Sequence, residues 1–544
     1  MMHLICFRLK SIFLSPVYYL GYALILACFF GFQFILHKSK LVFINYQAQF
    51  EVYTYLEIVL LMIVFCIAVY LLQQESNAEE LCLYSKQKIL LSNMVASYIA
   101  LLFLCIIPSI YVVVGAITQK TEMMFTSNAL IYVWIRWILL ITAPFSFACL
   151  ANYFHPHKTI YLLSLPVTVV FTYLNANIIR LFSFVGNDEF FVEKTSAFFS
   201  MQNPFVNSLI VEFAGARVDY FLICKLLYVL VALITTWTLI IGLFSKRKKK
   251  KVAFFLLLLI LETGIIYKWF QFFPERYSSN EKIFVQTDNR DSNIIKSYRG
   301  DIKLGEKISV NCDVVVDTPK NKKMRVRLDK SFDIKEIKCE QSDISYNRDG
   351  DYIDIAFEKE ISGDVMLNFI YSGRVYYISE IGVIDLYSAK TSAALPAMFA
   401  YIPIIDGDDS VKNYDFNVIA KNQLISNLEV SKIGNHQYAL KGEAKTCSLF
   451  AGYFSEYEKK GVTVYRMKYN KLTNYDETYD FMSEIPYYDA FDKNEKEKES
   501  LPPIKKAFLI SANYTVHNQP IYFGDYVLMN YGSIVERAGG EENA

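Results

Sequence analysis

The sequence lacks the motifs of zincin-type peptidases and of P-loop ATPases. It holds only six histidines, and none stands in the H-E-x-x-H pattern that places two zinc ligands on one face of a helix. It has no G-x-x-x-x-G-K-[ST] loop to cradle phosphates. Its ten cysteines never form C-x-x-C, which excludes a zinc or redox motif of that kind. We therefore expect no catalytic residues, resident metal or cofactor in this chain.

Charge is balanced over the whole chain but concentrated in one place. The formal net charge of +1 gives no electrostatic argument for binding nucleic acid. A run of six cations is also typical of a nuclear-localisation or nucleic-acid patch, but this one separates two apolar stretches, 220–244 and 252–266. Short loops rich in Lys and Arg between membrane spans stay in the cytoplasm. We therefore predict a cytoplasmic hairpin at Lys246, Arg247, Lys248, Lys249, Lys250 and Lys251.

Long apolar runs fill the first half of the chain. A helix needs about 20 apolar residues to cross the roughly 30 Å of bilayer hydrocarbon. Candidate spans are 13–36, 52–72, 89–114, 128–150, 160–173, 220–244 and 252–270. The fifth is the weakest, because it is short and contains Pro166. The first run has no A-x-A-like cleavage site, so we predict a retained helix, preceded by a short interfacial helix over residues 1–11.

Counting these seven spans from the cytoplasmic hairpin gives an orientation. The N-terminus is then cytoplasmic, and everything after Phe270 lies outside the cytoplasm. The remaining basic residues divide almost evenly, so this orientation depends on 246–251. The loop 174–219 contains amphipathic stretches at 196–205 and 206–214, where we predict short helices at the membrane interface. We expect a six-helix domain over 1–245, a hairpin and seventh helix over 246–273, and an extracytoplasmic domain over 274–544 of a multi-pass plasma-membrane protein.

The second half of the chain changes to alternating apolar and polar residues. This alternation at 307–317, 324–329, 351–357 and 364–371, with turn residues at 348–350 and 372–373, predicts antiparallel strands. Further strands are expected near 415–420, 437–441, 448–453 and 462–468, and a partly helical segment at 470–499. Short strands at this spacing indicate a mainly β, sandwich-like domain. Its cysteines, Cys312, Cys339 and Cys447, allow at most one disulfide.

Charged residues inside predicted spans are functional candidates by default. They are Glu57, Arg136 and Glu262. Their depth allows Arg136 to pair with Glu57 or with Glu262. Such a pair is either structural, which we favour, or part of a substrate pathway. In the second half, the acidic turn Asp406–Asp409 is either a calcium site or a solvated turn, and we favour the turn.

The cytoplasmic loop after the second span is acidic, then apolar, then basic. A short amphipathic helix fits it and could dock into a groove of a cytoplasmic partner, whereas a plain connecting loop is the alternative. Leu81, Leu83 and Tyr84 would lie on one side of this helix, with Glu79, Glu80 and Lys86 exposed. The loop resembles the coupling segment of ABC-2 type exporter permeases, although Ala78-Glu79 replaces that family's Gly-Thr pair. The matching residues are Glu75, Glu79, Leu81, Leu83, Ser85, Lys86, Lys88, Ile89 and Leu90.

The resemblance extends over residues 1–245 through the basic N-terminal helix, the six spans and the amphipathic loop before the sixth. It implies a separate ABC ATPase dimer that binds ATP and magnesium and presses on the segment 75–88. It also implies a second membrane subunit, identical or different, in the same lipid bilayer. The missing phosphate-binding loop agrees with an ATPase on another chain.

Two motifs in the second half point to another family. Residues 393–403, A-A-L-P-A-M-F-A-Y-I-P, and 448–454, S-L-F-A-G-Y-F, resemble the N-terminal β domain of M1 family aminopeptidases, over about residues 300–470. That domain also occurs fused to ABC-2 membrane regions. The family's catalytic H-E-x-x-H and G-x-M-E-N motifs are absent, so the resemblance implies the β domain without the catalytic one. The sequence leaves open whether the chain is a shortened version of a longer permease–peptidase fusion.

These patterns together predict the membrane subunit of an ABC exporter. It would be a transport subunit and not an enzyme, and it would move a hydrophobic or peptide-like substrate. The alternative is a membrane-anchored binding or scaffold protein whose helices only carry the β domain. A membrane peptidase is the third possibility, and the missing zinc ligands argue against it.

Overall fold

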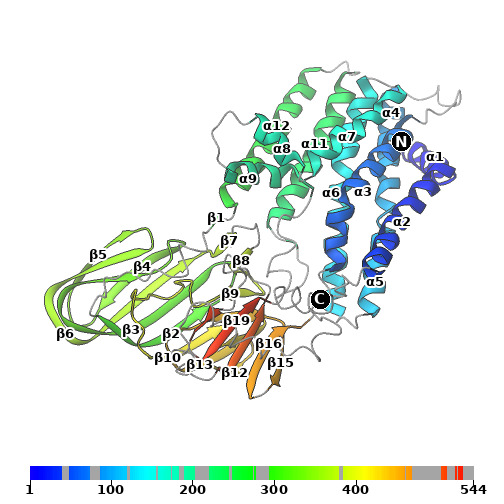
Figure 1. Cartoon of the computed structure of the whole chain (residues 1–544). Coiled ribbons are helices and arrows are strands. Elements are labelled where there is room, and N and C mark those ends of the chain that lie inside the picture. Colours follow the sequence, from blue (N-terminus) through cyan, green and yellow to red (C-terminus); the bar gives the residue numbers. More distant parts are fainter. Residues whose placement is uncertain are drawn as a thin grey trace. The chain divides into compact units, whose positions relative to one another are not determined.

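The computed structural model divides the chain into two compact units, with the boundary at Phe273 and Pro274. Figure 1 shows the elements of both units. The coarse prediction is confirmed, because the chain has a helical region with several apolar helices followed by a mainly β region. The residues that the structure describes are 1–38, 48–73, 86–118, 123–154, 157–172, 174–182, 189–201, 218, 220–243, 248–273, 275–276, 293–378, 384–459, 461–468, 504–510, 521–523 and 525–530.

The helical unit begins with α1 (Met2–Phe13) and α2 (Pro16–Lys38), which meet at a bend of 64°. Pro16 favours this break, since it fits the first turn of a helix but cannot continue one. The helices α3 (Ala48–Gln73), α4 (Lys86–Phe103), α5 (Ile106–Thr118) and α6 (Met123–Phe154) follow. A group of short helices then precedes α11 (Tyr220–Leu243) and α12 (Lys248–Phe272). The short ones are η2 (Lys158–Leu163), α7 (Ser164–Phe171), α8 (Asn175–Phe182) and α9 (Glu189–Phe199).

Five helices of the described chain are long and apolar enough to cross a membrane, and a sixth is added if α1 and α2 count as one bent span. Six of the seven predicted spans therefore have a matching long helix or bent pair. The fifth does not, because Lys158–Phe171 is too short to cross alone. The last candidate span is Val252–Phe272, which agrees with the predicted start at Val252. The helix α12 itself begins earlier, at Lys248, so four of the six cations of the run lie in its first turn.

The β unit contains three sheets (Figure 1). The largest has the strand order β12-β13-β10-β2-β3-β6-β4, and β5 also pairs with β6. Its strands are β2 (Ile294–Lys303), β3 (Ile308–Arg327), β4 (Phe332–Cys339), β5 (Ile344–Asp349), β6 (Tyr352–Gly373), β10 (Lys412–Ile419), β12 (Glu429–Gly434) and β13 (Gln437–Ala444). The predicted strands at 307–317 and 324–329 are one long strand, β3, and those at 351–357 and 364–371 are one strand, β6.

The second sheet has the order β1-β7-β8-β9-β14-β11, and the third has the order β15-β16-β17-β19-β18. Strands of the second are β1 (Glu275–Arg276), β7 (Tyr376–Ile378), β8 (Ile384–Ser388), β9 (Ala393–Leu395), β11 (Gln423–Ser426) and β14 (Leu449–Gly452). Strands of the third are β15 (Phe454–Lys459), β16 (Val462–Met467), β17 (Lys506–Ile510), β18 (Ile521–Tyr522) and β19 (Tyr526–Asn530). In the third sheet β16, β17 and β19 are parallel, which the prediction of antiparallel strands did not anticipate.

The core of the largest sheet forms as the alternating sequence dictates. In β3, Val310, Cys312, Val314 and Val316 are buried on one face, because successive side chains of a strand point to opposite faces. The turn between β5 and β6 requires Gly350, whose φ of 58° lies in the left-handed region. The three cysteines of this unit are free thiols, and the disulfide that their number allows does not form.

Candidate functional site in the helical unit

The short helices before α11 are tied into one hairpin by buried polar groups. The backbone N–H of Met201, just after α9, donates to the carbonyl of Phe171 at the end of α7, with an N···O distance of 2.8 Å. Asn175, at the start of α8, donates from Nδ2 to the carbonyls of Val170 (3.0 Å) and Ser196 (3.3 Å). The Ser196 hydroxyl donates back to Asn175 Oδ1. These contacts satisfy backbone groups that an uninterrupted helix would satisfy by itself.

Lys225 holds the end of this hairpin against α11. Its side chain is 1% exposed, and Nζ donates to the carbonyl of Ser200 at 2.6 Å. The ammonium also lies 5.4 Å from the ring centroid of Trp269 on α12, a cation–π arrangement. Because Ser200 directly follows α9, the charge sits at the helix terminus that carries partial negative charge. Three elements thus converge on one buried cation.

Aromatic packing surrounds this cation. The Phe198 ring of α9 lies 5.4 Å from Trp269 and 4.7 Å from Tyr228, measured between centroids. Phe221 on α11 lies 5.2 Å from Trp269. Sequence reasoning missed Lys225, although a lone lysine inside the predicted span 220–244 was the available signal.

The structure places the three predicted intramembrane charges in separate surroundings. Glu57 on α3 is fully buried and Arg136 on α6 is 4% exposed. Glu262 on α12 accepts a hydrogen bond from the Thr235 hydroxyl of α11 at 2.7 Å. Within the described residues no ion pair joins Arg136 to Glu57 or to Glu262, and Arg136 Nη1 has no hydrogen-bond partner.

Arg136 and Glu57 nevertheless lie at similar depths. The C-terminal end of α3 meets the chain just after α6, where Gln73 Nε2 donates to the His157 carbonyl at 3.4 Å. With a rise of about 1.5 Å per residue, Glu57 is roughly 24 Å along α3 from Gln73, and Arg136 is roughly 27 Å along α6 from Phe154. The two helices pack against each other. The bundle therefore contains two buried charged residues at one level.

Most of the predicted coupling segment lies outside the described residues. Glu75, Glu79, Glu80, Leu81, Leu83 and Tyr84 all fall in 74–85. Lys86 begins α4. Of the cation run, Lys246 and Arg247 lie outside the described residues, and Lys248–Lys251 form the first turn of α12.

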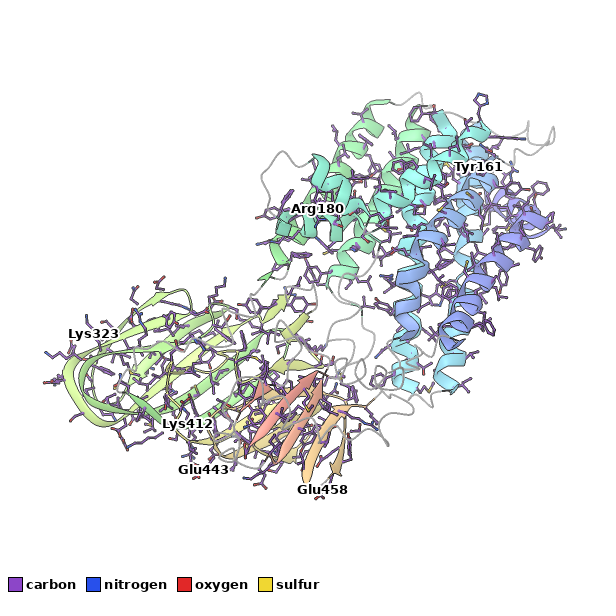
Figure 2. All side chains as sticks on the ribbon, in the orientation of Figure 1. Tyr161, Arg180, Lys323, Lys412, Glu443 and Glu458 are labelled. Carbon is purple, nitrogen blue, oxygen red and sulfur yellow. The ribbon has the colours of Figure 1, made fainter. Side chains whose placement is uncertain are left out.

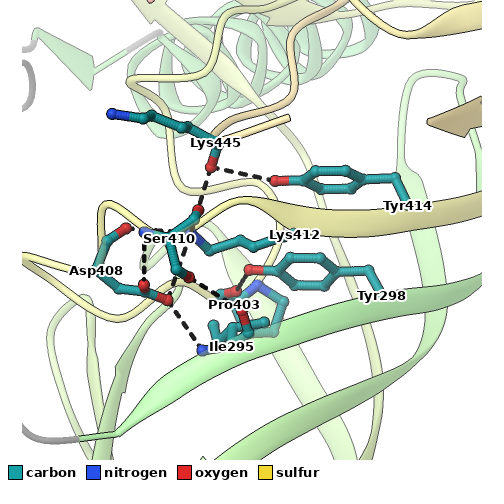
Figure 3. A network of polar contacts seen from close by, with 8 residues as sticks. All are labelled: Ile295, Tyr298, Pro403, Asp408, Ser410, Lys412, Tyr414 and Lys445. Atoms are coloured by element: carbon teal, nitrogen blue, oxygen red, sulfur yellow. Dashed lines mark hydrogen bonds and ion pairs between the residues drawn. The ribbon is translucent and has the colours of Figure 1, made fainter. Parts of the chain in front are cut away.

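In the β unit, the acidic turn at 406–409 is neither solvated throughout nor an open calcium site. The Lys412 ammonium lies among four oxygens: the carbonyls of Ser410 (2.8 Å), Asp408 (3.1 Å) and Lys445 (3.3 Å), and the Asp408 carboxylate (3.4 Å) (Figure 3). Carboxylate and carbonyl oxygens are the ligands that calcium prefers. Here the ammonium group of Lys412 occupies the place among these oxygens that a bound cation would take, and it balances the charge of the Asp408 carboxylate.

This network is buried and joins two distant segments of the chain. The Lys412 side chain is 5% exposed and that of Asp408 is 2% exposed. Asp408 also accepts from the backbone N–H groups of Ile295 (2.9 Å) and Ser410 (3.0 Å). Burial lowers the pKa of Lys412, and the nearby Asp408 carboxylate opposes that shift. The network is therefore a structural connection between β2 and β10.

The described residues contain no group of three or more His, Cys, Asp or Glu side chains that could hold a metal ion. The printed sequence also lacks the H-E-x-x-H donors that a zinc peptidase requires. The residues present do not fit a catalytic zinc, and no chemical step is derived through one.

Comparison with known proteins gives similarity at the level of solved structures. No protein-family model and no curated protein matches the sequence. The chain is similar to leukotriene A4 hydrolase of Saccharomyces cerevisiae, with 9% identity and a TM-score of 0.31, over 44% of this chain and 41% of that one. It is also similar to an M1 zinc metallopeptidase of Deinococcus radiodurans, with 9% identity and a TM-score of 0.33, over 46% of this chain and 63% of that one. The chain thus spans less than two thirds of either enzyme.

Proposed function

We propose that this chain is the membrane subunit of an ABC-type exporter, driven by an ATPase on a separate chain. The observation that carries the proposal is the order of elements in the helical unit. A bent helix pair and three long apolar segments precede a hairpin of short helices, and α11 follows. This order agrees with the resemblance of residues 1–245 to ABC-2 permeases.

In this proposal the segment 75–88 receives the movement of the ATPase. Lys86 and Lys88 begin α4, so a push on the segment is passed along the axis of that helix. The helix α4 packs on α1, α3 and α6, which gives the movement a route into the bundle. A hydrophobic or peptide-like substrate is moved outward, and the β unit acts on the extracytoplasmic side.

The test is purification of the full chain from its native membranes, followed by measurement of ATP hydrolysis in lipid nanodiscs. We expect a P-loop ATPase to co-purify in stoichiometric amount, and the complex to hydrolyse ATP faster than the ATPase alone. Replacing Glu79→Ala together with Leu83→Ala should remove the stimulation. The matched control replaces Glu443→Ala and Ile433→Ala, both exposed in the β unit, and should retain it.

The alternative is a membrane-anchored scaffold that uses its β unit to recruit a partner. It predicts that the purified chain carries no ATPase. It also predicts that the Glu79→Ala and Leu83→Ala pair behaves like its control. Either result would refute the transport proposal.

A further inference from the structure

One edge of the largest sheet is open where β3 runs beyond its neighbour. β2 pairs with β3 only between Ser309 and Asp317, whereas β6 pairs with it as far as Arg327. On the β2 side of β3, the described residues beyond Asp317 make only one further pairing, between Arg327 and Ile404. Figure 2 labels Lys323 at this end of the curved ribbon formed by β3, β5 and β6.

The Arg327–Ile404 pairing shows which backbone groups the open edge presents. Arg327 N–H donates to the Ile404 carbonyl (2.7 Å), and Ile404 N–H donates to the Arg327 carbonyl (2.9 Å). Backbone groups of alternate residues in an antiparallel strand point to the same side. The N–H and C=O groups of Lys323 and Arg325 therefore point outward along the same edge. Within the described chain no strand pairs with them.

The two faces beside this edge differ sharply. Lys323, Arg325 and Arg327 line a hollow of about 740 Å³ together with Tyr352 and Asp354. On the opposite face Met324 is 3% exposed and Val326 is 1% exposed. An added strand would thus place alternate side chains beside cations and the intervening ones beside apolar residues.

The charge of the edge is positive. The segment 318–327 holds no acidic residue and five cations: Lys320, Lys322, Lys323, Arg325 and Arg327. Arg325 is bound by Asp354 at 2.6 Å, and Arg327 by Asp406 at 3.2 Å. Lys323 is exposed and has no ion pair within the described residues, so its charge is available to an incoming group.

We propose that the Lys323–Arg325 edge of β3 binds an extended peptide as an added strand. The peptide carries acidic side chains at alternate positions and apolar ones between them. Main-chain hydrogen bonds to Lys323 and Arg325 provide the docking, as in other cases of strand addition. An acidic side chain of the peptide pairs with Lys323, the cation of the hollow that has no ion pair within the described residues. This proposal is independent of ATP-driven transport.

The experiment uses the full chain in nanodiscs of uncharged lipid, without any ATPase. The probe is a fluorescent peptide, Asp-Val-Glu-Val-Asp-Val-Glu, and binding is measured by fluorescence anisotropy. We expect saturable binding that weakens at least tenfold in the Lys323→Glu, Arg325→Glu variant. The matched control, Lys338→Glu with Lys441→Glu, reverses two exposed charges elsewhere in the same sheet and should bind as the unaltered chain does.

Two further peptides separate strand addition from simple charge attraction. A peptide methylated at alternate backbone nitrogens cannot complete the hydrogen-bond ladder, so it should bind at least tenfold more weakly. A peptide of the same composition with its acidic residues in one block should also bind weakly. Equal binding of all three peptides, or no binding of the first, would overturn the proposal. Neither result would bear on whether the helical unit is a permease.

Discussion

Two buried lysines illustrate how the same residue serves different surroundings. Lys225 caps the end of α9 within the helical unit, and Lys412 neutralises a carboxylate within the β unit. The Lys412 ammonium contacts three carbonyls and a carboxylate, and that of Lys225 contacts the Ser200 carbonyl beside the Trp269 ring; these contacts compensate for lost water. Removing one partner of such a buried pair costs more than the pair contributes, because the other charge is left behind.

At Lys412 this reasoning gives a measurable loss of stability. We expect Lys412→Met to lower the free energy of unfolding by about 3–5 kcal/mol, because the buried Asp408 carboxylate loses its counter-charge. Adding Asp408→Asn should restore part of this loss, since the amide is neutral and its oxygen still accepts from Ile295. Chemical denaturation followed by circular dichroism measures both. A double variant no more stable than Lys412→Met would contradict the account.

The Lys225 contact predicts a similar effect on the helical unit. Lys225→Met keeps the length of the side chain but removes the bond to the Ser200 carbonyl. A hydrogen bond from a charged group contributes roughly 1.5–3 kcal/mol, so the protein in detergent should unfold at a lower temperature. Lys268→Met is the matched control, because Lys268 is an exposed lysine near the end of α12. Equal effects of the two variants would show that burial of Lys225 is unimportant.

At the scale of elements, the β unit is stabilised by buried tyrosines that bridge strands to loops. Tyr298 donates to the Pro403 carbonyl (2.8 Å), Tyr371 to that of Tyr401 (2.9 Å), and Tyr401 to that of Cys447 (3.1 Å). Burial raises the pKa of each phenol well above the ordinary value of 10.0. The folded protein therefore holds these protons more tightly than the unfolded chain does.

This difference gives a pH dependence of known sign. The stabilisation is complete below the unfolded pKa of 10.0 and is lost as the pH rises toward the raised folded pKa, because the unfolded chain releases its protons first. Above pH 10.0, each such tyrosine should lower the free energy of unfolding by roughly 1.4 kcal/mol for each pH unit. Tyr371→Phe removes one of these phenols, so the free energy of unfolding should fall less steeply with pH, by roughly 1.4 kcal/mol per pH unit. An unchanged slope would contradict the assignment. Burial lowers the pKa of Lys412 and that of Lys506, and both of these shifts act in the opposite direction.

The elements also show what could be predicted from sequence. The strand β10 was found because one of its faces is buried and the other is polar, which leaves a period of two in the sequence. The parallel pairing of β16, β17 and β19 was missed, because pairing direction depends on the path of the chain in space. The role of Asp408 was missed for the same reason, since Lys412 and Ile295 reach it only in the folded unit.

At the scale of the whole molecule, the proposed membrane topology depends on the hairpin α7–α9. Within the described residues, length and composition give at most six candidate spans, an even number, which would leave both ends of the helical unit on one side. The proposal needs a seventh crossing. The proposal assigns this crossing to the hairpin, which begins near the end of α3 (Gln73 to His157) and ends near the first turns of α11 (Ser200 to Lys225).

The central claim is therefore that residues 75–86 and the β unit lie on opposite sides of the membrane. Labelling of intact cells with a membrane-impermeant maleimide tests it, in a background with Cys6→Ser and Cys339→Ser. One variant retains Cys82 of the coupling segment, and the other carries Cys82→Ser with Lys441→Cys on an exposed position of β13. The account predicts labelling of Lys441→Cys in intact cells, and of Cys82 only after permeabilisation. Labelling of both positions from the same side would contradict it.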